Sequence, residues 1–259
     1  MARLGPFRII EAPFNMGLEG AGVGKGPRHL VNAGADQALS YRGMPAEVQH
    51  VRLWNFNSRD LDAVVDVNRQ IRAAVQQACG DQVVPVVLAG NCNSAIGTLA
   101  GMEPALTGVV WLDAHPDFHT PETSLSGRLE GMSLAVAAGH CHDDLRARSG
   151  LSQPIDVRNI CLPACFDVEP GERERVAEAG LGQEFPEGVE AVYLHLDIDF
   201  LDIRQPKGMP LERACQLVRS IAAELPVAAV GLTNFNPDVE GADERTVAAI
   251  SLLKQLARD

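Results

Sequence analysis

The chain has few basic residues, few aromatic residues and no long apolar run. Its 259 residues include 22 Lys and Arg against 34 Asp and Glu, a net charge of −12. A general nucleic-acid binder needs clustered cationic side chains, so this balance argues against that class. No stretch reaches the ~20 apolar residues of a membrane-spanning helix. Glu11 and two prolines interrupt the N-terminal region, so we do not expect a signal peptide.

Cysteine is present, but not in the patterns that mark disulfide scaffolds or zinc sites. The six cysteines are scattered, and none forms a C-x-x-C pair. With 46% hydrophobic residues the chain can bury a large core without disulfides, so we expect reduced thiols and a cytoplasmic protein. No Pro/Gly/Ser-rich linker divides the sequence, which predicts a single domain over residues 1–259.

Apolar segments of strand length alternate with segments of helical period. The predicted strands are 8–14, 48–54, 83–90, 108–115, 156–162, 191–200 and 228–235. The predicted helices are 58–79 with Ser58 as N-cap, 210–224, and 243–257. This alternation predicts an α/β fold with a mostly parallel sheet and helices on both faces, in which ligands bind at the carboxyl ends of the strands. The irregular stretches 11–27 and 117–130 are expected to form active-site loops.

Two groups of ionisable residues follow predicted strands. WLDAHPDFHT places Asp113, His115 and Asp117 after an apolar run, and YLHLDIDFLD does the same with Asp197 and Asp199. In an extended chain, alternate residues share one face, and charges gathered at a buried edge need a common counter-ion. Either group alone is equally well explained by acids that reach water. Together, four carboxylates and an imidazole suit hard divalent cations such as Mn²⁺, and two such ions would balance the four negative charges.

Other motifs are weaker. The Gly-rich segment EGAGVGKGPRHL fails the common phosphate-loop patterns and predicts a loop with a helix start near Pro27. GMSLA resembles a nucleophile elbow around Ser133, but it does not follow a strand. GHCHDD and the isolated His29, His50 and His195 are interpreted as ordinary polar positions rather than as ligands.

The segments DAHPDFHT and DIDFLD resemble the two metal-binding signatures of the ureohydrolases, the arginase and agmatinase family. KGPRHLVNAG, LAGNCNSAIG, SGRLEGMSLA and NFNP resemble further family segments in the right order. The resemblance implies a three-layer arginase-like fold of about eight mostly parallel strands, a binuclear Mn²⁺ centre, and attack of a metal-bridging hydroxide on a guanidine carbon. It also implies that Asp113 and Asp197 bridge the metals and that His115 and Asp199 complete one site. Asp117 would belong to the other site and act as the catalytic hydrogen-bond partner of the hydroxide.

Three positions depart from the family pattern near the chemistry. Asn93 is assigned to the place of a histidine ligand, which implies a weak or water-mediated metal ligand and a weaker site beside it. Glu130 stands where the family has a proton-shuttling histidine, so it is expected to be catalytic. Asn234 stands where arginases have a glutamate that pairs with the guanidinium.

The resemblance also implies substrate-binding positions. FDVEPGER matches a stretch that contacts the substrate's α-amino group, with Glu169 in place of an Asp and Glu172 retained. Ser126 matches a serine near the α-carboxylate, and His119 stands where arginases have Asn. These matches favour an amino acid with an intact α-centre.

The loss of a guanidinium partner at Asn234 fits a less basic guanidine. The sequence resembles the altered arginase-like enzymes of D-cycloserine antibiotic biosynthesis, which hydrolyse Nω-hydroxy-L-arginine to hydroxyurea and L-ornithine. The alternatives are an arginase or other ureohydrolase that releases urea, and an inactive metal-binding relative. Neither Ser133 nor Cys92 is expected to be essential for turnover. The expected partner is a small guanidino amino acid, and the oligomeric state is left open, with a homo-oligomer among the options.

Overall fold

One parallel sheet runs through the molecule. The computed structural model describes residues 4–52, 60–102, 107–203 and 206–257. In these ranges seven strands lie in the order β4-β1-β5-β9-β8-β6-β7, and every pairing is parallel. They are β1 (Phe7–Ala12), β4 (Glu47–His50), β5 (Val84–Ala89), β6 (Thr107–Leu112), β7 (Ile160–Cys161), β8 (Ala191–Asp197) and β9 (Val227–Thr233). The predicted parallel sheet is confirmed, with seven strands in the described ranges where the family resemblance implied about eight.

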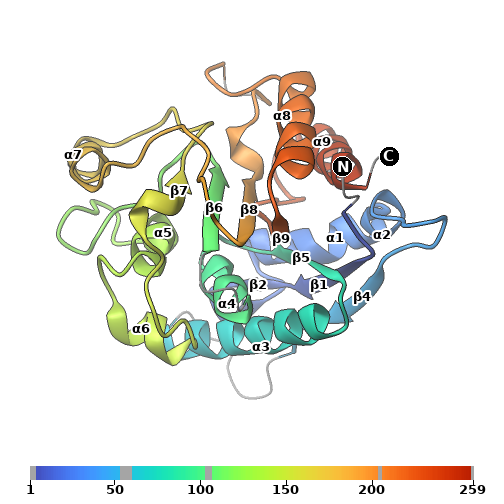
Figure 1. Cartoon of the computed structure of the whole chain (residues 1–259), viewed down its shortest axis with the longest axis horizontal. Coiled ribbons are helices and arrows are strands. Elements are labelled where there is room, and N and C mark those ends of the chain that lie inside the picture. The colour runs from blue at the N-terminus through green and yellow to red at the C-terminus, as the bar shows by residue number, and fades with distance from the viewer. Residues whose placement is uncertain (1–3, 53–59, 103–106, 204–205, 258–259) are drawn as a thin grey trace.

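Helices cover both faces of the sheet, as Figure 1 shows. One face carries α3 (Leu61–Gly80), α4 (Ser94–Gly101), α5 (Ser133–Ala137) and α6 (Asp143–Arg148). The other carries α1 (Gly26–Asn32), α2 (Ala35–Ala38), α8 (Leu211–Glu224) and α9 (Ala242–Leu256). α7 (Pro170–Ala179) lies near the β7 end of the sheet. The three-layer α/β fold expected from the sequence is therefore confirmed. In the described ranges, no helix has the length and apolar character needed to cross a bilayer.

Alternate residues of the central strands pack into two separate hydrophobic cores, one on each face of the sheet. In β5, Val87 and Ala89 pack with the α3 and α4 layer, whereas Val86 and Leu88 pack with the α8 and α9 layer. A strand buried on both faces reads as a continuous apolar run, and this is why such runs marked the strands in the sequence. All six cysteines are free, as expected.

Most predicted helix ends lie close to the observed ones. α3 begins after Asp60, whose carboxylate accepts a hydrogen bond from the Ala63 amide at 2.9 Å. The predicted N-cap, Ser58, lies outside the described residues. α1 has Pro27 in its first turn, as the sequence indicates. α8 and α9 each lie within one residue of their predicted ranges.

Several predicted boundaries were wrong. The strand predicted over 48–54 is β4, which ends at His50. The strand predicted over 156–162 is β7, which has only two residues and follows a 3₁₀ turn, η3 (Val157–Asn159). The stretch 11–27 is more regular than expected. It contains the end of β1, a hairpin of β2 (Phe14–Asn15) and β3 (Leu18–Glu19), a 3₁₀ turn, η1 (Gly22–Lys25), and the start of α1.

The ionisable residues do not share an extended strand face, and here the sequence argument was wrong. β6 ends at Leu112, before the first group, and Asp199 lies in the 3₁₀ turn η4 (Ile198–Phe200) after β8. Asp113 accepts a hydrogen bond from the His115 amide at 2.7 Å, which closes a turn. Asp117 has a φ of 49°, in the left-handed region. The turns after the strands, rather than strand alternation, bring these side chains together.

Candidate metal centre

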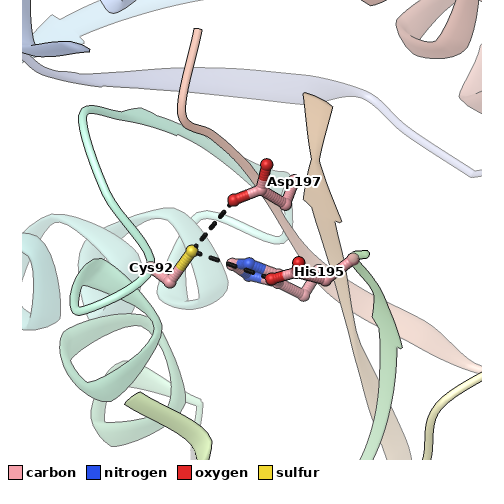
Figure 2. A group of neighbouring side chains, drawn as sticks. Cys92, His195 and Asp197 are labelled. Atoms are coloured by element: carbon pink, nitrogen blue, oxygen red, sulfur yellow. Dashed lines mark hydrogen bonds between the residues drawn. The ribbon is translucent and has the colours of Figure 1, made fainter. Parts of the chain in front are cut away.

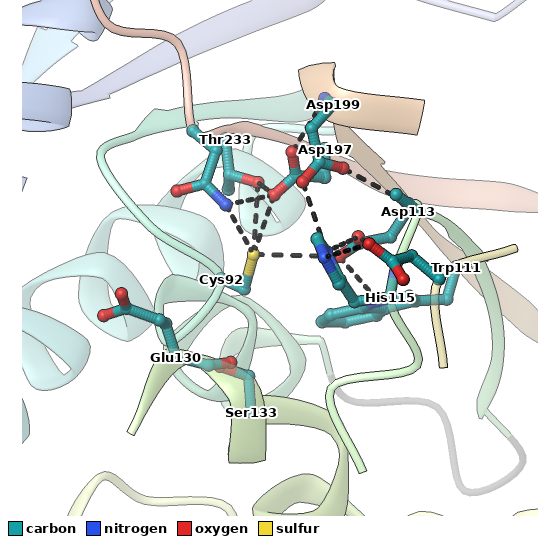
Figure 3. A network of polar contacts seen from close by, with 12 residues as sticks. Cys92, Trp111, Asp113, His115, Glu130, Ser133, Asp197, Asp199 and Thr233 are labelled. Carbon is teal, nitrogen blue, oxygen red and sulfur yellow. Dashed lines mark hydrogen bonds and ion pairs between the residues drawn. The ribbon is translucent and has the colours of Figure 1, made fainter. Parts of the chain in front are cut away.

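Donor atoms from four neighbouring strand ends meet at one edge of the sheet. Cys92 follows β5, Asp113 follows β6, Asp197 ends β8, and Thr233 ends β9. Two groups of possible ligands form there, each with its donor atoms within 4.8 Å of one another. The outer group is Asp113, His115 and Asp199, and the inner group is Cys92, Asp113, His195 and Asp197. Figure 2 shows three members of the inner group, and Figure 3 shows the polar network around both.

The outer group is built around the His115 imidazole. Its Nδ1 lies 3.3 Å from Oδ1 of Asp113 and 3.2 Å from Oδ2 of Asp199. Hydrogen bonds to these two carboxylates raise the pKa of His115 to about 12. Burial alone would raise the pKa of Asp199, but the hydrogen bond and charge of His115 outweigh it and lower that pKa. Among its own side chains, this group therefore contains the counter-charge for its carboxylates.

The inner group is fully buried. The Cys92 thiol donates to Oδ2 of Asp197 at 3.1 Å and lies 4.0 Å from Oδ2 of Asp113. Burial raises the pKa of Asp113 to about 7 and places that of Asp197 well above its ordinary value. Burial, reinforced by the neighbouring carboxylates, also raises the pKa of the Cys92 thiol well above its ordinary value. A bound cation would favour the ionised form of each of these groups.

Asp117 provides the clearest sign that the site is made for a cation. Its backbone carbonyl accepts from the Leu134 and Ala135 amides at 3.0 and 3.1 Å, which anchors the left-handed turn to α5. Its Oδ2 is buried and has no hydrogen-bond partner in the described part of the chain. Burial, followed by the charges of Asp113 and Asp197, raises its pKa well above the ordinary value. A buried, unpaired carboxylate oxygen is costly unless a cation or donor satisfies it.

Cys92, and not Asn93, directs its side chain into the centre. The Asn93 amide donates to Met16 Sδ and Asn91 Oδ1, each at 3.3 Å, and accepts from the Ser133 hydroxyl at 3.2 Å. Cys92 is therefore the better placed of the two residues to be a ligand, and the role of Asn93 as a weak or water-mediated ligand stays a prediction. The chain turns into α4 at this point, so the two consecutive side chains point in different directions.

Two other positions assigned from the sequence lie outside the hydrogen-bond network of the carboxylates. The Glu130 carboxylate lies 3.7 Å from Nη1 of Arg128, and in Figure 3 it extends away from the two ligand groups. Ser126 is exposed in the 117–130 loop, where its hydroxyl accepts from the Arg128 amide at 3.2 Å. Their catalytic and substrate-binding roles remain predictions.

Three of the residues assigned to the substrate's amino-acid end do come together. Nε2 of His119 lies 3.1 Å from Oε2 of Glu169 and 3.6 Å from Oε2 of Glu172. Glu172 is buried and accepts from the Phe118 amide at 2.7 Å, whereas Glu169 is exposed. Because Phe118 follows Asp117 directly, this polar cluster is joined to the carboxylate site through the chain.

Asn234 lies against the inner group. The backbone of Asn234 has a φ of 59°. The side-chain amide nitrogen donates to Oδ2 of Asp197 and, at 3.5 Å, to the Cys92 sulfur. The neutral amide of Asn234 is thus in direct contact with the Asp197 carboxylate. The family resemblance implies that this carboxylate bridges two metal ions.

Sequence reasoning missed Cys92 and His195 as members of the site. Cys92 stands in the turn directly after a central strand, a position that could have identified it. His195 stands two residues before Asp197, so both side chains point to the same face of β8. Within the described residues, the donor set of carboxylates, imidazole and thiol, together with the unpaired Asp117 oxygen, fits a divalent metal centre.

Comparison with known proteins agrees with this geometry. Residues 6–257 match the model of the arginase family. The chain belongs to the arginase family. It is 29% identical to an arginase of Bacillus caldovelox, with 97% of each chain covered, and 29% identical to an arginase of Bacillus subtilis, with 78% and 77% covered. The crystal structure of arginase from Bacillus subtilis superposes with a TM-score of 0.87 at 25% identity, covering 98% of this chain and 99% of that one. The expected enzyme class, a metal-dependent hydrolase of guanidino C–N bonds, is confirmed at the level of the family.

Proposed function

We propose that this enzyme hydrolyses Nω-hydroxy-L-arginine to hydroxyurea and L-ornithine, the reaction of the D-cycloserine enzymes that the sequence resembles. The observation that carries this proposal is the contact of the Asn234 amide with Asp197 and Cys92. Arginases are expected to place a glutamate there. Because Asn234 is an amide, the charged guanidinium of arginine would have one carboxylate fewer to pair with in this site. An N-hydroxyguanidine is less basic, so it depends less on that charge.

The metal centre that supports this chemistry is proposed to hold two Mn²⁺ ions. Asp113 and Asp197 would be shared between them. His115 and Asp199 would complete the outer site, and Cys92 and Asp117 the inner one. When bound, two divalent cations supply hydroxide from water near neutral pH, and hydroxide is the nucleophile that an unreactive guanidine carbon requires.

The chain's own groups would divide the remaining tasks. Asp117 has a buried oxygen without a partner, so it can accept a hydrogen bond from the attacking water and hold its proton. Glu169 and Glu172 lie beside His119, and this cluster would receive the amino-acid end of the substrate. Two carboxylates can bind an α-amino group, and the imidazole between them can face an α-carboxylate. Ser126 and Glu130 would take part only if the 117–130 loop closes over the substrate.

The test compares kcat/KM for hydroxyarginine and arginine, with Mn²⁺ present and the products identified. Hydroxyarginine should be preferred at least tenfold, because an incompletely paired buried charge costs more than the ~1.4 kcal/mol that changes a rate tenfold. Asn234→Glu should shift the preference toward arginine, and Asn234→Gln, which keeps the amide, serves as the matched control.

Two results would replace the proposal with an alternative. If the ratio of kcat/KM for hydroxyarginine to that for arginine is near one, and urea is the main product of arginine, the enzyme is an arginase. No turnover of either substrate by protein that binds two metal ions would make it an inactive relative.

A further inference from the structure

A chain of hydrogen bonds lies beneath the inner group and ends on Asp197. The Tyr193 hydroxyl lies 2.9 Å from Nδ1 of His195, and Nε2 of His195 lies 3.4 Å from the Thr233 hydroxyl. The Thr233 hydroxyl in turn donates to Oδ2 of Asp197 at 3.3 Å. Tyr193, His195, Asp197 and Thr233 are all 0% exposed. Figure 2 shows His195 beside Asp197, and Figure 3 shows Thr233 on the same carboxylate.

The register of the sheet builds this arrangement. His195 pairs with Trp111 of β6 on one side and with Gly231 of β9 on the other, while Asp197 pairs with Thr233. A Cβ at Gly231 would collide with the Tyr193 hydroxyl, so this glycine makes the space in which the hydroxyl reaches His195. Alternate residues of β8 share a face, so Tyr193, His195 and Asp197 all lie on the α4 side of the sheet.

When Asp197 is ionised, as a metal ligand must be, the three hydrogen bonds run in only one consistent direction. The Thr233 hydroxyl gives its single proton to Asp197, so it must accept from Nε2–H of His195. Nδ1 of the neutral imidazole is then an acceptor, and the Tyr193 hydroxyl donates to it. If His195 took the other tautomer, Nε2 would become an acceptor, and Asp197 would have to compete with it for the Thr233 proton.

The same imidazole also supports the other shared carboxylate. The Trp111 indole stacks on His195 with ring centroids 3.6 Å apart and an interplanar angle of 9°. Its Nε1–H donates to Oδ2 of Asp113 at 3.1 Å. His195 is therefore linked to Asp197 through Thr233 and to Asp113 through Trp111.

We propose that His195 is a positioning residue, held in one tautomer by Tyr193, that orients Asp197 through Thr233 and Asp113 through Trp111 for metal binding. This inference rests on the metal centre of the proposed function, but not on its substrate. Fixed partners behind a ligand reduce the reorganisation needed on binding, and losing them typically costs about 10–100-fold in metal affinity or activity.

The test uses full-length protein stripped of metal and titrated with Mn²⁺ by calorimetry, alongside kcat, KM and Tm. Thr233→Val removes the donor to Asp197, and Tyr193→Phe removes the group that fixes the tautomer. Each should weaken Mn²⁺ binding by about tenfold and lower kcat, with KM changed less than twofold. Thr233→Ser keeps the hydroxyl and should restore wild-type binding to within twofold.

The double variant distinguishes a connected chain from two separate contacts. If Tyr193 acts through His195 and Thr233, Tyr193→Phe should add little in the Thr233→Val background. Thr98→Val is the matched control, because it deletes a buried threonine hydroxyl whose 2.9 Å bond goes to the Ser94 carbonyl within α4. That control should change Tm but not Mn²⁺ affinity.

The proposal is overturned if the two substitutions lower only Tm, or if their effects on Mn²⁺ affinity multiply. Wild type that binds two ions, with variants that bind them equally well, would remove this inference and leave the proposed function standing. Wild type that binds no divalent metal would overturn both.

Discussion

The two ligand groups that share Asp113 differ in how their charges are balanced. In the outer group, the His115 imidazole contacts both Asp113 and Asp199, and its side chain is 44% exposed. In the inner group, Cys92, His195 and Asp197 are no more than 1% exposed, and their neighbours include the unpaired oxygen of Asp117. The outer group thus contains its own cationic partner and is reached by solvent, whereas the inner group is buried, and burial raises the pKa values of Asp197 and Cys92.

This difference makes the two sites unequal in a defined way. The outer group offers Mn²⁺ two carboxylates and an imidazole, whereas the inner group includes a thiol, which is a softer donor than Mn²⁺ prefers. A cation at the inner group also has to displace the proton of that buried thiol, whose pKa burial raises well above its ordinary value. We therefore expect the inner site to be the weaker. This keeps the expectation of two unequal Mn²⁺ sites but changes its cause from a poor Asn93 ligand to the cost of ionising Cys92.

The largest expected effect comes from Asp117→Asn. The substitution removes the proton acceptor and weakens the inner site, so turnover should fall about 10⁴-fold. Steady-state kinetics measure this loss, while calorimetry should still show the outer Mn²⁺ step. If the variant kept more than a tenth of the wild-type kcat, Asp117 would not be the proton acceptor for the attacking water.

Removing metal should destabilise the whole fold, because a cation that binds only the folded chain adds its binding free energy to the stability of that chain. Mn²⁺ at about 1,000 times its Kd should contribute about 4 kcal/mol. For a chain of this size that corresponds to roughly 8–16 °C in Tm. Calorimetric melting with Mn²⁺ and with a chelator measures the shift. Equal melting temperatures in the two conditions would contradict a metal centre at this edge of the sheet.

Substitutions at Cys92 should act on one of the two binding steps. Cys92→His removes the need to ionise a buried thiol and should tighten the weaker Mn²⁺ step about tenfold, whereas Cys92→Ala should weaken it by a similar factor. His115→Asn is the matched change in the outer group and should weaken the stronger step. If Cys92→Ala bound both ions like wild type, the thiol would not be a ligand.

The smallest expected effect is at His119, which lies with Glu169 and Glu172 rather than with either ligand group. His119→Asn gives up the 3.1 Å contact of Nε2 with the exposed Glu169, and polar contacts of this kind contribute up to about 1 kcal/mol. We expect KM for hydroxyarginine to rise about threefold with kcat unchanged. A fall in kcat of more than tenfold would mean that His119 influences the reacting end of the substrate.

The parallel sheet, and most of the positions that form the candidate metal centre, could be predicted from the sequence. Strands buried on both faces must be apolar throughout, and helices between them must be amphipathic, so each element leaves a local signal. Asp113, His115, Asp117, Asp197 and Asp199 stood out because charged residues directly after buried strands are costly without a partner. The wrong step was the assumption of an extended chain. It nevertheless selected residues that lie near one another, because the turns after β6 and β8 also bring them to the edge of the sheet.

Only the tertiary structure distinguished Cys92 from Asn93. The two are adjacent in the sequence, and the direction of each side chain depends on where the chain turns from β5 into α4. The role of His195 was equally hidden, because a histidine in an apolar strand resembles any buried polar residue. What it contacts depends on the register of three strands, which places Trp111, Gly231 and Thr233 around it. Strand register is set by contacts between residues that are distant in the sequence, and so no local pattern could reveal it.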